Sequence, residues 1–313
     1  MNEKQAFCTI LDDDHTYGFC VLLTSLLIEN PWFNLDFIIF EFGLGLSRVS
    51  KEQIKNIYPK ASFKKINTRH YDGCSFVGTR QWSRATPTQK KIKSAAFALN
   101  KSYELDVQGT EEYNAAYRFE IFTLKGYESI IYIDADMVVV GDISGLVQNN
   151  DFKFAGCPLE HPRNPFKRKP KGYNGGLLKI SSQYLDSGET QEGQETKGAL
   201  IKLCSADKHE FKGNQPVINE YFFDRPGSGL LDSCYNAQTE QICSQEILDQ
   251  AKILHFVGVS KPWSPASIRD PGTPANEMRN FFSQWQIQMV GTYMCLESVS
   301  YTHLRAHETG RNI

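Results

Sequence analysis

The sequence predicts an α/β fold in which a mixed, mostly parallel β-sheet is flanked by helices. Three observations lead to this prediction. The chain has 313 residues, enough for one large α/β domain or two small ones. Apolar segments of strand length alternate with segments of helical periodicity. The most apolar strand-like segment is interrupted by two carboxylates. Such alternation is typical of a parallel sheet with helices on both faces.

The elements alternate in chain order through the first half of the sequence. Strands are predicted at residues 5–11, 37–42 and 62–66, where β-branched and aromatic residues gather. Helices are predicted at residues 18–29, 50–58 and 113–124, where apolar residues recur every three or four positions. Ser47 and Ser50 are the candidate N-caps of the second helix.

Residues 130–140, with the sequence IIYIDADMVVV, are the most informative part of the chain. The apolar residues are typical of a buried strand. Two buried carboxylates are unfavourable unless a cation neutralises them. Alternate residues of a strand point the same way, so Asp134 and Asp136 can reach one cation if the strand ends there. The pair therefore predicts a divalent metal site.

Composition excludes several other classes of protein. The formal charge of −2 gives no basic bias, so nucleic acid is not an expected partner. No apolar run reaches the ~20 residues of a membrane span, and the first residues lack the apolar core of a signal peptide. The eight cysteines form no Cys-x-x-Cys pair, which favours free thiols in a reducing compartment. A cytoplasmic protein is predicted.

Two segments stand outside the regular pattern. Residues 78–112 begin with a basic stretch, which is either a solvated helical face or an insertion that handles an anionic or sugar acceptor. Residues 298–313 are polar and unpatterned and resemble a translated sequencing-adapter read-through. If so, the natural C-terminus is missing, and otherwise the tail is disordered. One domain is predicted over residues 1–297, and no function is assigned to the tail.

Three further segments carry polar residues in apolar surroundings. Residues 173–180 begin with Tyr-Asn-Gly-Gly, where glycines allow close backbone approach, although a plain turn also explains them. Residues 254–263 contain a histidine, a glycine and a lysine that can serve a metal and a phosphate. Residues 213–219 open a helical stretch with polar side chains, and helix capping alone could account for the asparagine at 214.

Together these segments resemble the family 8 glycosyltransferases, a retaining group that includes glycogenin and lipopolysaccharide galactosyltransferases. The resemblance rests on the D-x-D motif at 134–136, Asn-Gly-Gly at 174–176 and H-F-x-G-x-x-K-P-W at 255–263. It implies the GT-A fold, a Rossmann-like sheet flanked by helices. It also implies transfer of a hexose from a UDP-sugar to a carbohydrate or glycoconjugate acceptor.

The resemblance implies a role for each matching residue. Asp134, Asp136 and His255 match the ligands of a Mn²⁺ ion, with Mg²⁺ as the alternative. The other positions fall into three groups. The residues matched to diphosphate contacts are Gly258 and Lys261. Those matched to the uracil site are Ile10, Leu11, Asp12 and either His15 or Tyr17. Those matched to positions facing the donor sugar are Arg118, Asn174, Asn214 and Gln215. Peripheral contact with a membrane is compatible with this reading, and the oligomeric state is left open.

Asn214 departs from the family, which has an aspartate at this position. An amide cannot act as a carboxylate nucleophile, which argues against double displacement through residue 214. The sequence therefore favours front-face attack by the acceptor hydroxyl, with retention at the anomeric carbon.

Three alternatives stay open at this point. Asp134-Ala-Asp also fits the opening motif of a haloacid-dehalogenase-type phosphatase, although the later acidic motif of that class is missing. A sugar-nucleotide-binding homologue with impaired catalysis would be consistent with Asn214. A self-glycosylating primer like glycogenin is the third.

Overall fold

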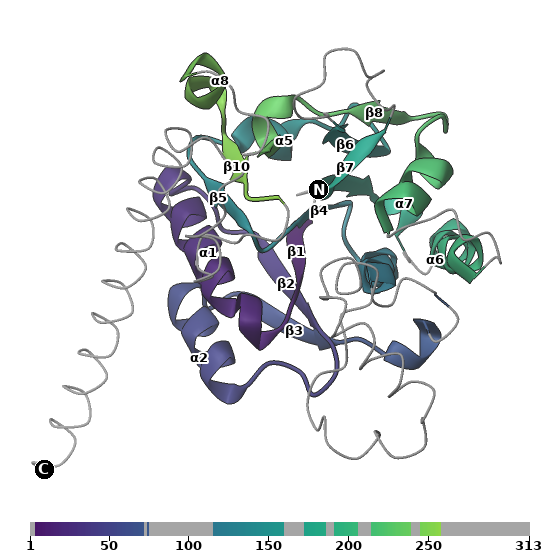
Figure 1. Ribbon diagram of the computed structural model, residues 1–313, viewed down its shortest axis with the longest axis horizontal. Coiled ribbons are helices and arrows are strands. Elements are labelled where there is room, and N and C mark those ends of the chain that lie inside the picture. Colours follow the sequence, from purple (N-terminus) through teal and green to yellow (C-terminus); the bar gives the residue numbers. More distant parts are fainter. Residues whose placement is uncertain are drawn as a thin grey trace, which may run out of the picture.

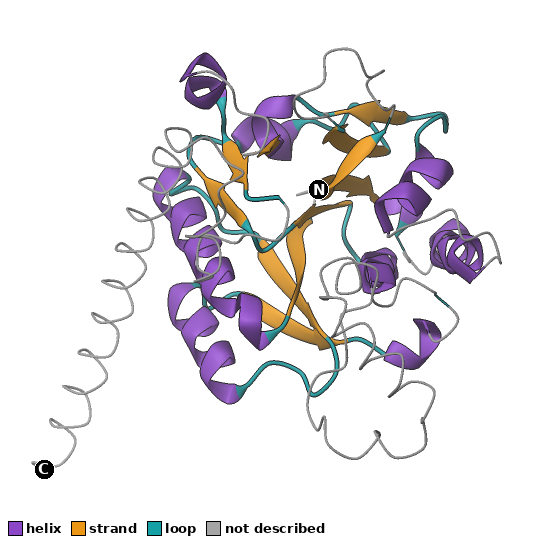
Figure 2. Ribbon diagram, in the orientation of Figure 1, coloured by secondary structure: helices purple, strands orange, loops and turns teal. Residues whose placement is uncertain are grey.

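The computed structural model describes residues 4–71, 74, 115–159, 172–185, 191–205, 214–238 and 245–257. The predicted α/β fold is confirmed: a seven-stranded sheet and a three-stranded sheet are covered by helices (Figures 1 and 2). The basic segment 78–112 and the tail 298–313 lie outside the described residues, so the predicted domain boundary stays a prediction.

The large sheet has the strand order β3-β2-β1-β4-β7-β6-β8. Its strands in chain order are β1 (Gln5–Leu11), β2 (Asp36–Glu41), β3 (Ala61–Lys65), β4 (Ser129–Ile133), β6 (Phe154–Pro158), β7 (Tyr173–Ser181) and β8 (Ser228–Leu230). Strands β3, β2, β1 and β4 are parallel, whereas β7 is antiparallel to both β4 and β6. The sheet is thus mixed and mostly parallel.

Helices pack on both faces of this sheet. The α-helices are α1 (Thr16–Glu29), α2 (Arg48–Ile57), α5 (Ser144–Gln148), α6 (Gln191–Ser205), α7 (Asn214–Phe222) and α8 (Gln245–Gln250). The 3₁₀ helices are η1 (Asp13–His15), η2 (Thr68–Tyr71), η4 (Ala115–Thr123), η5 (Ser182–Tyr184) and η6 (Ser233–Asn236). Ser47 caps α2 by accepting a hydrogen bond from the Ser50 amide, which confirms one of the two candidate caps.

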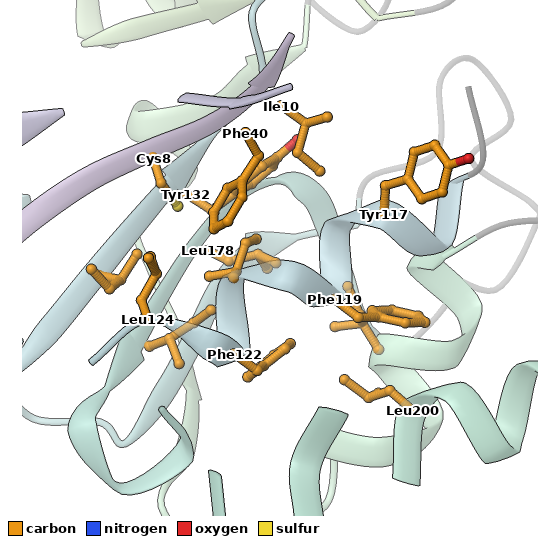
Figure 3. Close-up of a cluster of buried hydrophobic side chains, with 14 of the residues drawn as sticks. Cys8, Ile10, Phe40, Tyr117, Phe119, Phe122, Leu124, Tyr132, Leu178 and Leu200 are labelled. Carbon is orange, nitrogen blue, oxygen red and sulfur yellow. The ribbon is translucent and has the colours of Figure 1, made fainter. Parts of the chain in front are cut away.

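Side-chain alternation along the strands produces a core on each face. Phe7 and Leu11 of β1 pack with α1 and α2, whereas Cys8 and Ile10 point to the opposite side. There η4, α6 and α7 supply large apolar side chains, of which Phe119 and Leu200 are labelled in Figure 3. Each fully buried Phe or Leu contributes about 1.5–3 kcal/mol, so η4 is firmly attached to the sheet.

The apolar run at 130–140 does not form one strand. Strand β4 ends at Ile133, and the chain turns through the two aspartates before β5 (Met137–Val139) enters the small sheet. That sheet has the order β5-β10-β9, with β9 at Ala237–Gln238 and β10 at Ile253–His255. Strand β4 therefore ends directly before the two aspartates, as the predicted metal site between them requires.

The order of the parallel strands identifies the edge at which a ligand is expected. The chain adds β2 and β3 on one side of β1 and then returns to place β4 on the other side. Ligands of open α/β sheets bind outside the carboxyl ends of the strands at such a reversal. Leu11 and Ile133 end β1 and β4, and the residues that follow them, Asp12 and Asp134, lie at this edge.

Two further findings concern the described residues alone. None of their helices is both long and apolar enough to cross a membrane. None of their six cysteines forms a disulfide.

Candidate functional site

Asp134, Asp136 and His255 form a cluster at the junction of the two sheets. Strand β10 pairs antiparallel with β5, and His255 lies opposite Met137 in the register. The His255 Nε2 lies 3.3 Å from the Asp136 Oδ1 and 3.9 Å from the Asp134 Oδ2. One ligand atom from each residue lies within 4.8 Å of the others. The structure thus brings together the three residues that the sequence predicted as metal ligands.

The chemistry and spacing of this cluster fit a divalent cation. Bonds of about 2.1 Å in an octahedral site place cis ligands about 3.0 Å apart and trans ligands about 4.2 Å apart. The Nε2–carboxylate distances of 3.3 and 3.9 Å fall between these values. Two carboxylates with one imidazole suit a transition metal such as Mn²⁺ better than Ca²⁺, which prefers oxygen ligands alone.

Arg118 and Tyr132 hold one oxygen of Asp134. The Asp134 Oδ1 accepts hydrogen bonds from Arg118 Nη2 at 2.6 Å and from the Tyr132 hydroxyl at 2.5 Å. The Arg118 guanidinium also lies over the Tyr132 ring, 4.6 Å from its centroid. These contacts orient the carboxylate so that Oδ2 faces His255.

Arg118 also connects three other parts of the site. Its Nη1 donates to the Gly175 carbonyl at 2.8 Å and to the Asn214 Oδ1 at 3.3 Å. The side chain is 9% exposed, so the ion pair with Asp134 is largely shielded from water. A planar guanidinium can make these bonds together because its donors have fixed directions.

Asn214 and Gln215, at the start of α7, are held by the backbone around them. The Asn214 Nδ2 donates to the Ala115 carbonyl at 2.8 Å, while its Oδ1 accepts from Arg118. The Gln215 Oε1 accepts from the Gly175 amide at 2.9 Å. No capping hydrogen bond accounts for Asn214 in the described residues, since both ends of its amide join α7 to η4.

Asn174 and Asn236 connect His255 to the backbone of β7. The Asn174 Oδ1 accepts from the Gly176 amide at 2.8 Å and from the Asn236 Nδ2 at 3.0 Å. The Asn236 Oδ1 lies 2.8 Å from the His255 Nδ1. Sequence reasoning missed Asn236, because a single asparagine in a short irregular segment carries no distinguishing pattern.

The two glycines of Asn-Gly-Gly make room for the side chains of the site. A Cβ on Gly175 would overlap the Arg118 Nη1, and a Cβ on Gly176 would lie 2.8 Å from the His255 Nδ1. Real Cβ atoms essentially never approach another heavy atom below 3.0 Å. The glycines therefore permit close approach, as the sequence suggested, and the groups that approach are Arg118 and His255.

Replacing Gly176 by alanine is expected to displace the His255 ring. We expect a loss of about 1–3 kcal/mol in the free energy of unfolding from overpacking, and at least about tenfold weaker divalent-metal affinity. Urea unfolding and calorimetric Mn²⁺ titration measure the two effects. Gly198→Ala is the matched control, because nothing lies within 4 Å of its added Cβ and alanine favours the helix. Equal Mn²⁺ affinity in both variants would contradict the steric explanation.

The residues assigned to uracil lie at the carboxyl end of β1. Ile10 and Leu11 are buried, and Asp12 caps η1 by accepting from the His15 amide. The His15 Nδ1 also lies 2.6 Å from the Asp12 Oδ1. Tyr17, in the first turn of α1, is 39% exposed. Gly258 and Lys261, which were assigned to the diphosphate, lie outside the described residues.

The mixed α/β sheet, with an Asp-x-Asp turn after its switch-point strand and a histidine beside that turn, agrees with the GT-A fold that the sequence predicted. The family model for glycosyl transferase family 8 matches residues 7–266. The chain belongs to this family, and it is a glycosyltransferase. The phosphatase reading of Asp134-Ala-Asp is therefore wrong.

Individual relatives agree with this assignment. The chain is 22% identical over 281 residues to a lipopolysaccharide 1,2-glucosyltransferase of Escherichia coli K12, covering 82% of the chain and 72% of that protein. It is 25% identical over 179 residues to mouse glycogenin-1, covering 55% of the chain but only 46% of glycogenin-1. A crystal structure of the galactosyltransferase LgtC with donor and acceptor sugar analogues matches with a TM-score of 0.58 at 14% identity, covering 90% of this chain and 94% of LgtC. That structural likeness shows the fold alone.

Proposed function

We propose that the chain is a Mn²⁺-dependent, retaining hexosyltransferase that moves a sugar from a UDP-sugar to a hydroxyl of a glycan, lipopolysaccharide or similar acceptor. The observation that carries the proposal is the Asp134–Asp136–His255 cluster beside Arg118, at the edge where β1 and β4 end. Cytoplasmic location stays a prediction.

The charge of the site suits departure of a diphosphate. Bond breaking at the anomeric carbon develops negative charge on the leaving UDP, and a bound divalent ion stabilises that charge. Asp134, Asp136 and His255 would hold the ion. Arg118 keeps one Asp134 oxygen oriented in a largely buried setting, where such interactions are stronger than in water. Lys261 and Gly258 are proposed to contact the diphosphate.

The end of β1 suits the nucleoside. Backbone groups at Ile10 and Leu11, together with the Asp12 carboxylate, are proposed to contact uracil. His15 or Tyr17 is proposed to stack on the base. The Tyr17 side chain is 39% exposed in the first turn of α1, and the His15 Nδ1 lies 2.6 Å from the Asp12 Oδ1.

The sugar is proposed to lie among Arg118, Asn174, Asn214 and Gln215. Three of these residues, Arg118, Asn174 and Gln215, hydrogen-bond to the backbone of Gly175 and Gly176. Asn214 joins them by accepting from Arg118. Asn214 is an amide, so we propose front-face attack by the acceptor hydroxyl in place of a covalent enzyme intermediate. Assignment of the product anomer by NMR tests this mechanism, and inversion at the anomeric carbon would contradict it.

A panel of nucleotide-sugars tests the proposed function. UDP release is measured for UDP-glucose, UDP-galactose and other donors with an acceptor mixture, in Mn²⁺ and in EDTA. We expect release from at least one UDP-sugar that is lost in EDTA. Intact-mass measurement in the same reactions detects self-glycosylation. Binding of a UDP-sugar without turnover for any acceptor would favour the catalytically impaired homologue.

Asn214→Asp is expected to lower activity. The change would place a carboxylate oxygen against the Ala115 carbonyl oxygen, now 2.8 Å from the Asn214 Nδ2. The lost hydrogen bond leaves a repulsive contact that costs about 1–3 kcal/mol of stability. Urea unfolding and UDP-release rates measure the outcome, and Asn56→Asp, at an exposed position of α2, is the control for a general effect of added charge. A tenfold gain in rate would instead favour the impaired-homologue reading.

A further inference from the structure

The hydrogen bonds behind His255 determine which of its ring nitrogens carries the proton. The Gly176 backbone amide can only donate, so the Asn174 atom that it contacts at 2.8 Å must be the amide oxygen. This backbone group removes the usual ambiguity of asparagine orientation.

The assignment continues through Asn236 to the histidine. The Asn174 oxygen also faces the Asn236 amide at 3.0 Å, so the Asn236 atom there must be the NH₂ group. The other end of the Asn236 amide is then its oxygen, 2.8 Å from the His255 Nδ1. Because this oxygen can only accept, Nδ1 must carry a hydrogen.

We propose that Asn236 is a positioning residue that fixes the Nδ1–H tautomer of His255 and so leaves the Nε2 lone pair directed at Asp134 and Asp136. The inference rests on the metal site of the proposed function. Nε2 is the nitrogen that faces both carboxylates, at 3.9 and 3.3 Å. Metal-binding histidines commonly donate their other N–H to such a partner, which fixes the ring and raises its basicity.

The fold places Asn236 accurately for this role. Asp232 caps the 3₁₀ helix that ends at Asn236 by accepting from the Cys234 amide at 2.8 Å. Strand β9 begins at the next residue and pairs parallel with β10, with Gln238 opposite His255. Asn236 is 3% exposed and His255 is 4% exposed, so water does not readily replace the bond between them.

The test combines ring NMR with metal binding in three variants. Asn236→Leu removes both hydrogen bonds at similar size. Asn236→Asp keeps an acceptor for Nδ1–H. Asn30→Leu is the matched control, because Asn30 is also fully buried and uses both amide ends, on Ile143 and Gly141.

In metal-free protein, two-bond ¹H–¹⁵N spectra recorded at a pH where the ring is neutral should show the wild-type His255 proton on Nδ1. His255→Gln identifies the signals. We expect Asn236→Leu to shift the proton toward Nε2 and to weaken Mn²⁺ binding about 10–100-fold, whereas Asn236→Asp keeps the proton on Nδ1.

A proton on Nε2 in the wild type would overturn the proposal, whether or not the leucine variant folds. An Asn236→Leu protein with the wild-type tautomer, or with no weaker Mn²⁺ binding than Asn30→Leu, would overturn it too. Absence of Mn²⁺ binding to the wild type would overturn the metal site itself, while the metal-free spectrum still decides the tautomer.

Discussion

Asp136→Ala is expected to lower Mn²⁺-dependent sugar transfer about a thousandfold. The cluster would keep Asp134 and His255 but lose the carboxylate that lies nearest to the imidazole, at 3.3 Å. A metal held in this position would contribute several kcal/mol to the departure of the proposed diphosphate, and about 4 kcal/mol corresponds to three orders of magnitude in rate.

The measurement is the rate of UDP release at saturating donor, with circular dichroism and urea unfolding as checks of the fold. Asp151→Ala removes an exposed aspartate and should leave both unchanged. Substitution of Asp136 tests the metal site alone, whereas Asp134→Ala would also remove the ion-pair partner of the Arg118 guanidinium. A rate within tenfold of wild type in Asp136→Ala would contradict the assignment.

Arg118→Leu is expected to damage both stability and activity. The substitution removes the guanidinium donors that lie 2.8 Å from the Gly175 carbonyl and 2.6 Å from the Asp134 Oδ1, and leaves that carboxylate with the Tyr132 hydroxyl. Breaking a buried ion pair from one side costs about 3–5 kcal/mol. Loss of a partner that orients a metal ligand typically lowers metal affinity or activity about 10–100-fold, and we expect a loss of UDP-release rate in this range.

Arg118→Lys separates charge from geometry. Lysine keeps the positive charge but has no fork that can reach Asp134, Gly175 and Asn214 together. We therefore expect at least about a tenfold loss of UDP-release rate with a smaller loss of stability than in the leucine variant. Arg48→Lys, at an exposed position of α2, is the control. Wild-type rates in Arg118→Lys would show that only the charge matters.

Local pattern in the sequence predicted most of the fold. Strands β1, β2 and β3 fall within one residue of the predicted ranges. The first two are apolar runs bounded by polar residues, which is the pattern of a buried strand. The end of the strand at the two aspartates was expected, because burying two carboxylates is costly and a metal site at the strand's carboxyl end avoids that cost. The break into two strands in different sheets did not, since β5 pairs with β10 from more than a hundred residues later.

The parts of the site that escaped prediction depend on tertiary contacts. Arg118 was assigned to the donor, yet its ion pair with Asp134 joins residues on separate elements. Asn236 reaches His255 only because β9 and β10 pair. The glycines at 175 and 176 indicated close approach, but nothing in their local sequence identifies the side chains that approach.

Binding of Mn²⁺ in the presence of UDP is a direct measurement of the proposed metal site at Asp134, Asp136 and His255. Free aqueous Mn²⁺ gives a strong electron paramagnetic resonance signal that falls when the ion binds, so a titration yields stoichiometry and affinity. We expect one Mn²⁺ per wild-type chain with UDP and no comparable site in Asp136→Ala. Equal binding by both proteins, or no binding by a wild-type protein that binds UDP, would contradict it.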